Sequence, residues 1–118
     1  MTRAQVRKLA LSLPQATEEP HFETWSFRVR GKIFATVPPE GGHVHIFVDG
    51  DAVRMAVGND PKTFEELWWG KDLAGLRVHL PSAHPASVRE LLHAAWRRKA
   101  PAPLAAAFDG GRDEPGYR

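Results

Sequence analysis

The sequence predicts an α+β domain in which an antiparallel sheet carries helices packed on one side. Bulky apolar residues alternate with polar ones on both sides of Arg30-Gly31, which is the pattern of a β-hairpin with one buried face. Apolar residues also recur at helical spacing after Thr2 and after Pro85. Strands and helices therefore come in runs, in the order α-βββ-α-α-β-α.

Length and cysteine content limit the class of protein. A chain of 118 residues forms one domain with its own core, and the absence of cysteine excludes disulfides, thiolate nucleophiles and Cys-ligated metals. The N-terminus has no apolar signal segment, and no run approaches the roughly 18 apolar residues of a membrane span. We expect a cytoplasmic monomer with no membrane association, whose domain covers residues 1–108 and whose residues 109–118 form a flexible tail.

The N-terminal segment predicts a helix. Thr2 and Gln5 fit a capping box, and apolar residues then recur at helical spacing up to Pro14, which ends the helix. Residues 15–23 show no period and contain Pro20, so we expect a connecting loop there.

Three strands follow and predict an antiparallel meander. They cover residues 25–29, 33–37 and 43–48, each with alternating apolar residues. In the second strand, strict alternation places Phe34 on the face opposite Ala35.

The second half of the chain predicts two short helices and a fourth strand. Asp49 can cap a helix over residues 52–57, and Pro61 begins another, with Phe64, Leu67 and Trp68 inward. Residues 70–75 are expected to form a loop, and residues 76–80 alternate as a strand.

The strongest helical pattern begins at Pro85 and stops at Pro101, with a last turn expected over residues 104–108. Its exposed stripe carries Arg89, His93 and Arg97. The residues that we expect to be largely buried each lie on an apolar face; they are Trp25, Phe27, Ile46, Val78, Leu92 and Trp96.

Charge is unevenly distributed, although the net charge is only +2. Residues 3–32 hold six Lys/Arg against three Glu, and residues 70–99 hold six Lys/Arg against two acidic residues. Arg28, Arg30 and Lys32 gather at the hairpin tip, where they either contact phosphates or keep an exposed strand charged against aggregation.

The last long helix and an aromatic pair supply further candidates. Arg89, Arg97 and Arg98 either border a nucleic-acid groove or complement the helix dipole. Trp69 directly follows Trp68, so it either closes the edge of the core or offers a stacking platform for an unpaired base.

Catalytic and metal signatures are weak. His43 and His45 lie two residues apart on one strand face, a spacing that two metal ligands can use, but a third ligand would have to come from elsewhere, such as His21 or His79. Adjacent carboxylates such as Glu18-Glu19 cannot converge on one point from a regular element. We predict no catalytic residues, no enzyme activity, no cofactor and no metal.

Four segments together resemble the YjbR/MmcQ family of small bacterial proteins: Leu9-Ala-Leu-Ser-Leu-Pro14, Phe27-Arg-Val-Arg-Gly-Lys-Ile-Phe-Ala35, Leu67-Trp-Trp-Gly to Val78-His-Leu, and Leu91-Leu-His-Ala-Ala-Trp-Arg97. The resemblance covers residues 6–108 and departs at Gly75-Leu76, where many members have Gly-Trp. It implies a double-wing architecture, similar in shape to the frataxin-like fold, and a DNA-binding role.

The residues and the resemblance together lead to two hypotheses. The first is a non-catalytic DNA-binding protein that contacts the phosphate backbone through the basic hairpin and the basic helix. The alternative is a protein- or small-ligand-interaction module with a pocket near Trp69 and no nucleic-acid role.

Overall fold

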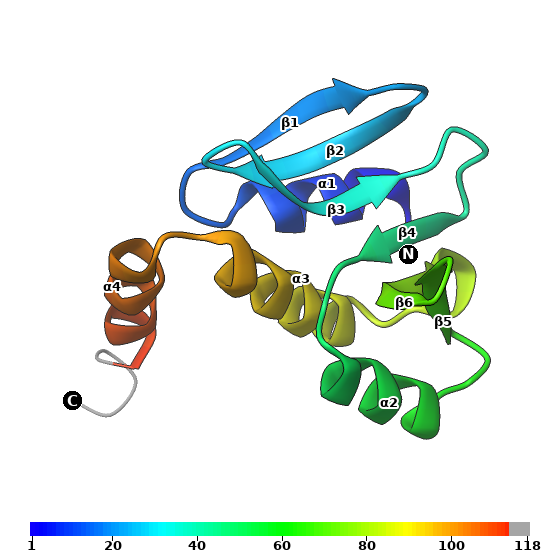
Figure 1. Ribbon diagram of the computed structural model, residues 1–118. Coiled ribbons are helices and arrows are strands. Elements are labelled where there is room, and N and C mark those ends of the chain that lie inside the picture. Colours follow the sequence, from blue (N-terminus) through cyan, green and yellow to red (C-terminus); the bar gives the residue numbers. More distant parts are fainter. Residues whose placement is uncertain (114–118) are drawn as a thin grey trace.

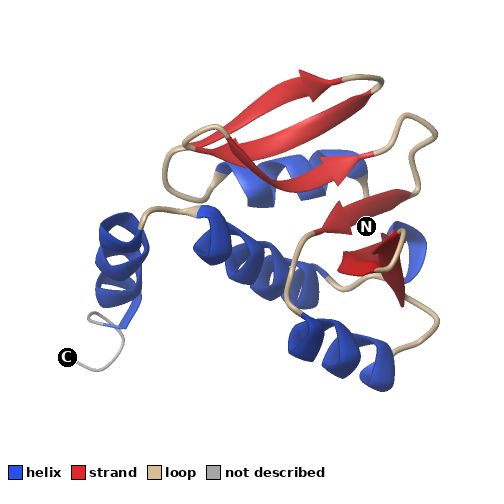
Figure 2. Cartoon of the chain, viewed as in Figure 1, coloured by secondary structure: helices blue, strands red, loops and turns tan. Residues whose placement is uncertain are grey.

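The computed structural model describes residues 1–113 of the chain, with side chains through residue 109. A six-stranded antiparallel sheet, ordered β1-β2-β3-β4-β6-β5, carries the helices on one face, which confirms the predicted α+β class (Figures 1 and 2). The elements are α1 (Arg3–Leu11), β1 (Ala16–His21), β2 (Thr24–Val29), β3 (Lys32–Val37), β4 (His43–Ile46), α2 (Gly50–Asn59), β5 (Phe64–Trp69), β6 (Asp72–His79), the 3-10 turn Leu80–Ser82, α3 (Pro85–Lys99) and α4 (Ala102–Asp113). In the described part of the chain, no helix combines the length and apolar character that crossing a membrane requires.

Helix α1 begins with the predicted capping box. The Gln5 amide donates to Thr2 Oγ1 at 3.2 Å, and the Thr2 amide donates to Gln5 Oε1 at 2.8 Å. The apolar face buries Val6 and Ala10 against the sheet and α3. Two of the orphan amide groups at the start of the helix are thereby satisfied.

The β2–β3 hairpin turns at Arg30 and Gly31, as predicted. Both residues have positive φ, 51° and 81°, which a two-residue turn needs to match the twist of its strands. One detail was predicted wrongly. Phe27 pairs with Ala35 and Arg28 with Ile33, so Phe34 is an extra residue, and this bulge lets both Phe34 and Ala35 point into the core.

The loop predicted over residues 15–23 is wrong, because β1 occupies most of it. This strand pairs with β2 along its whole length, from Ala16↔Val29 to His21↔Thr24. It lies at the edge of the sheet, where Pro20 is tolerated because one side of the strand needs no hydrogen-bond partner. A polar edge strand carries no apolar alternation, so the pattern could not reveal it.

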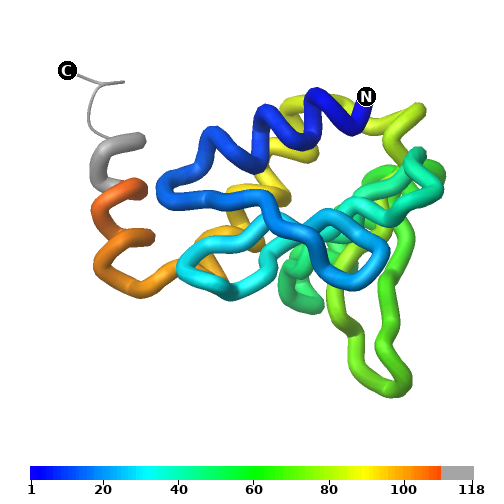
Figure 3. Tube along the Cα trace, turned by 90° about the horizontal axis from the view of Figure 1, so that it is seen from above, coloured from blue at the N-terminus to red at the C-terminus, as the bar shows by residue number. Residues whose placement is uncertain are grey.

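The helix predicted from Pro61 and the loop predicted over residues 70–75 are also wrong. The segment forms β5 and β6, which join in a two-residue turn at Gly70-Lys71. The spacing of Phe64, Leu67 and Trp68 resembles one face of a helix, which is why the pattern predicted a helix. Pairing with β6 instead makes this segment the second edge strand of the sheet. Figure 3 shows this hairpin extending away from the rest of the domain.

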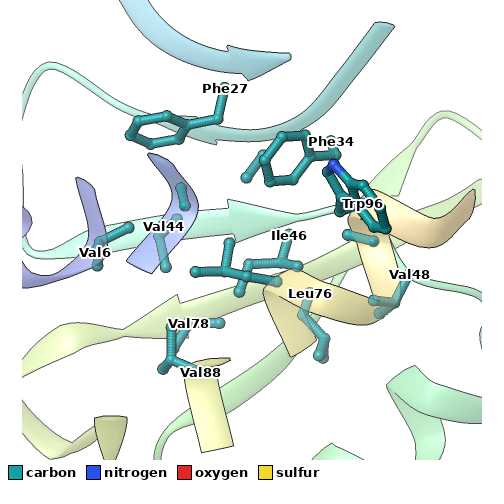
Figure 4. Close-up of a cluster of buried hydrophobic side chains, with 14 of the residues drawn as sticks. Val6, Phe27, Phe34, Val44, Ile46, Val48, Leu76, Val78, Val88 and Trp96 are labelled. Atoms are coloured by element: carbon teal, nitrogen blue, oxygen red, sulfur yellow. The ribbon is translucent and has the colours of Figure 1, made fainter. Parts of the chain in front are cut away.

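The core lies between the sheet and helices α1 and α3, and Trp96 is the largest of its fully buried side chains (Figure 4). Trp96 is fully buried beside Phe34, and its Nε1 donates to the Pro14 carbonyl at 3.0 Å. The predicted burial is confirmed for five of the six residues, namely Phe27, Ile46, Val78, Leu92 and Trp96.

Trp25 is the exception, because 46% of it is exposed. It lies on the helix side of the sheet as predicted, but the neighbouring surface of α1 presents Arg3 and Arg7, and these three residues line a shallow hollow. Polar side chains on the facing helix therefore leave the indole half uncovered.

Helix α4 is longer than the single turn predicted over residues 104–108. It runs on through residues 109–113, part of the predicted tail, and the other five tail residues, 114–118, lie outside the described residues. The Phe108 ring packs edge-on against Trp96 at a centroid distance of 5.2 Å, and Asp109 pairs with Arg97 at 2.7 Å. These contacts cover part of the α3 stripe that was expected to be exposed.

Gly75 permits a close backbone approach between β6 and the chain at the end of β4. A Cβ at this position would collide with the Ile46 carbonyl oxygen and lie 2.9 Å from the Phe47 Cα. A glycine is required here because both obstacles are backbone atoms, which cannot rotate away.

We predict that Gly75→Ala lowers the free energy of unfolding by about 1–3 kcal/mol, because the added methyl overpacks the β4–β6 contact. Gly58→Ala is the matched control, since that site in α2 is open space, and its stability should rise by up to about 1 kcal/mol. Urea denaturation of both variants measures the difference. Equal stability of the two would contradict the close approach.

Candidate functional site

A groove of about 710 Å³ lies between the β2–β3 hairpin and the β5–β6 hairpin. It opens where β3 and β4 part, since these strands pair only at Ala35↔Ile46 and Thr36↔His45, and the end of α3 reaches the opening. The residues that line it are His21, Thr24, Arg28, Gly31, Lys32, Ile33, Thr36, Phe47, Trp69, Asp72, Leu73, Ala74, Arg98 and Lys99.

Cations dominate the charge of this groove. Arg28, Lys32 and Arg98, three of the six cations singled out from the sequence, line it together, and Lys99 adds a fourth. Asp72 is the single carboxylate among the lining residues. A groove with this balance attracts anions, and its walls focus the positive potential.

Two of the four cations are held in place. Arg28 Nε donates to Ser26 Oγ at 3.0 Å, and its Nη2 donates to the Pro20 carbonyl at 3.4 Å. Arg98 Nη1 donates to the Phe47 carbonyl at 2.8 Å. A guanidinium has five N–H groups, so each arginine is oriented and keeps donors for a ligand.

The other three predicted cations lie outside the groove. Arg30 Nε donates to Gln15 Oε1, in the turn before β1. Arg97 pairs with Asp109 in α4, and Arg89 lines a separate hollow near the end of α1. The helix stripe and the hairpin tip therefore do not form one continuous surface.

Trp69 lines the groove with 60% of its surface exposed. Its ring centroid lies 5.2 Å from that of Phe47 at a tilt of 54°, and Phe47 is itself buried. Trp68 points to the opposite face of the hairpin, where its Nε1 donates to Glu66 Oε1 at 3.1 Å. The sequence did not place Phe47 or Lys99 at this site, since nothing in the pattern indicates that they meet Trp69 and Arg28.

His43 of β4 and His79 of β6 form a polar chain with Glu65 of β5. His43 Nε2 lies 3.2 Å from His79 Nδ1, and His79 Nε2 lies 3.2 Å from Glu65 Oε2. His45 instead stands opposite Arg77 in the β4–β6 register. Among the described residues, no three His, Cys, Asp or Glu side chains are grouped so as to hold a metal ion.

Burial lowers the pKa of His45 below its ordinary value of 6.5, and the positive charge of Arg77 lowers it further. His43 acts in the same direction, while Glu40 and Glu65 oppose the shift. The folded protein therefore binds this proton less tightly than the unfolded chain does.

We predict that the free energy of unfolding decreases as the pH falls below 6.5. The unfolded chain then binds a proton at His45 that the folded protein binds less tightly. Above that pH both states are neutral, and below the folded pKa the loss levels off. His45→Gln should flatten this part of the stability profile, and His84→Gln, at an exposed histidine, should not. Urea denaturation across a pH series checks this, and an unchanged profile in His45→Gln would refute it.

A family model described as YjbR matches residues 11–98. The matched range begins at the last residue of α1 and ends at Arg98 in α3, so it contains the whole sheet and three of the four groove cations. Neither the curated proteins nor the solved structures contain a match to the chain.

Proposed function

The chain belongs to the YjbR family, and we propose that it is a DNA-binding protein whose groove holds the phosphate backbone. One observation supports the proposal above the others. Four cations from β2, β3 and α3 line one groove that contains a single carboxylate. Lys and Arg that neutralise phosphates release condensed counterions, which supplies most of the affinity of sequence-independent binding.

The four cations are suited to two kinds of contact with phosphate. Arg28 and Arg98 are oriented by their hydrogen bonds, so each can present a fork of donors to the oxygens of one phosphate. Lys32 and Lys99 end flexible stems and act as point charges. Contacts to phosphate position the nucleic acid but read no bases, so we expect tolerance of sequence. We assign no catalytic step to this role.

We predict that Lys32→Gln with Lys99→Gln weakens binding to unrelated DNA sequences about equally. Each lost duplex contact should reduce the slope of log K against log salt by about 0.9, so that two contacts cost about 1.8. The two lysines suit the test because, within the part of the chain that the structure describes, neither side chain makes a hydrogen bond or ion pair whose loss would disturb the fold. Titrations at a series of salt concentrations give the slope.

The matched control replaces two exposed lysines outside the groove, Lys8→Gln with Lys62→Gln, and removes the same total charge. It should leave the slope close to that of the wild type. If both double variants lose the same affinity and slope, the binding reflects overall charge and not the groove. If the wild type does not bind DNA at low salt, the proposed function is wrong and an interaction module becomes the better hypothesis.

A further inference from the structure

We propose that the groove selects unpaired nucleotides, with Trp69 stacking on a base while the groove cations hold the adjacent phosphates. This inference rests on the proposed function and specifies the form of nucleic acid that the groove takes. It draws on the support beneath Trp69, the size of the groove and a second aromatic side chain at its border.

Trp69 is a supported aromatic surface and not part of the core. It leans on Phe47 at a centroid distance of 5.2 Å while 60% of it stays exposed. Phe47 is fixed through both of its backbone polar groups, since its amide donates to the Phe34 carbonyl at 3.1 Å and its carbonyl accepts from Arg98 Nη1 at 2.8 Å. The support is therefore in place before any ligand arrives, which lowers the cost of ordering on binding.

The same contact joins the aromatic surface to the positive charge. Arg98 reaches the backbone of the residue on which Trp69 rests, so a guanidinium and an indole are held by one short stretch of chain. A base on the indole would bring its own phosphates next to Arg98 and Lys99. Aromatic platforms beside a basic groove are the arrangement by which proteins bind single strands.

An indole can lie on a base only when that base is free. In a duplex both faces of each base are covered by its neighbours, whereas an unpaired base can be splayed out onto an aromatic side chain. The groove, at about 710 Å³, is in the size range of sites that enclose small molecules. A nucleotide fits inside such a volume, and a duplex can only lie across its rim.

A second aromatic side chain borders the groove at the β1–β2 turn. His21 lines the groove, and Phe22 packs edge-on against it at a centroid distance of 4.7 Å. Phe22 is 93% exposed and has a φ of 57°, so it is held in the solvent in a conformation that a bulky residue rarely adopts. Aromatic side chains therefore stand beside the cations both at Trp69 and at the β1–β2 turn.

The test compares a labelled oligothymidylate with a duplex of the same length by fluorescence anisotropy. The wild type should bind the single strand more tightly. Trp69→Leu should weaken single-strand binding about tenfold and leave duplex binding unchanged, because only the unpaired base stacks. Trp68→Leu is the matched control, since this tryptophan is 50% exposed and lies on the other face of the hairpin, and it should change neither. Trp69→Phe should recover most of the lost affinity.

The outcomes separate this inference from the proposed function. If the wild type binds neither nucleic acid at low salt, both fail. If it binds both equally, or if Trp68→Leu loses as much as Trp69→Leu, only the preference for unpaired bases fails. If thymidine monophosphate binds as tightly as the oligonucleotide, the groove is a site for free nucleotides and the single-strand assignment is wrong. Recovery in Trp69→Phe distinguishes lost stacking from a lost fold.

Discussion

The short contact between β3 and β4 is the constraint on which the groove depends. The two strands pair at two register positions, and one further backbone bond joins Phe47 to Phe34 before they diverge. The sheet is therefore continuous across the domain, but its β1–β2–β3 part and its β4–β6–β5 part diverge beyond this short contact. On the far side of β4, Gly75 lets the next strand pack closely against Ile46 and Phe47. Close packing of β6 against β4 and the parting of β3 from β4 together define the groove between the two hairpins.

Two extra residues shape the walls of the groove. Phe34 is additional in β3, and Ala74 is additional in β6, where Leu67 pairs with Gly75 and Trp68 with Leu73. A bulge bends its strand and increases the local twist, so β3 and β6 each curve where they meet the groove. The same irregularity that directs Phe34 into the core also directs Ile33 into the groove. Core packing and groove shape are consequently set by the same backbone feature.

Local signals made α1, the β2–β3 hairpin and α3 predictable, because a capping box, a glycine turn and an N-terminal proline act within a few residues. The edge strands β1 and β5 were missed because each is defined by its partner strand and not by its own pattern. The sequence also indicated which types of residue line the groove, but not that these residues lie close together. Arg97 and Arg98 are adjacent, yet one turns to Asp109 and the other to Phe47, which depends on where α4 and β4 lie.

The two edge strands of the sheet, β1 and β5, are poorly suited to bind a peptide as an additional strand. Pro20 interrupts the row of backbone donors along β1, and Glu65 and Glu66 place negative charges along β5. A peptide that binds by extending a sheet therefore meets a missing backbone donor at one margin and carboxylates at the other. The recognition proposed for the groove relies instead on side chains, which can be exchanged one at a time while the backbone stays the same.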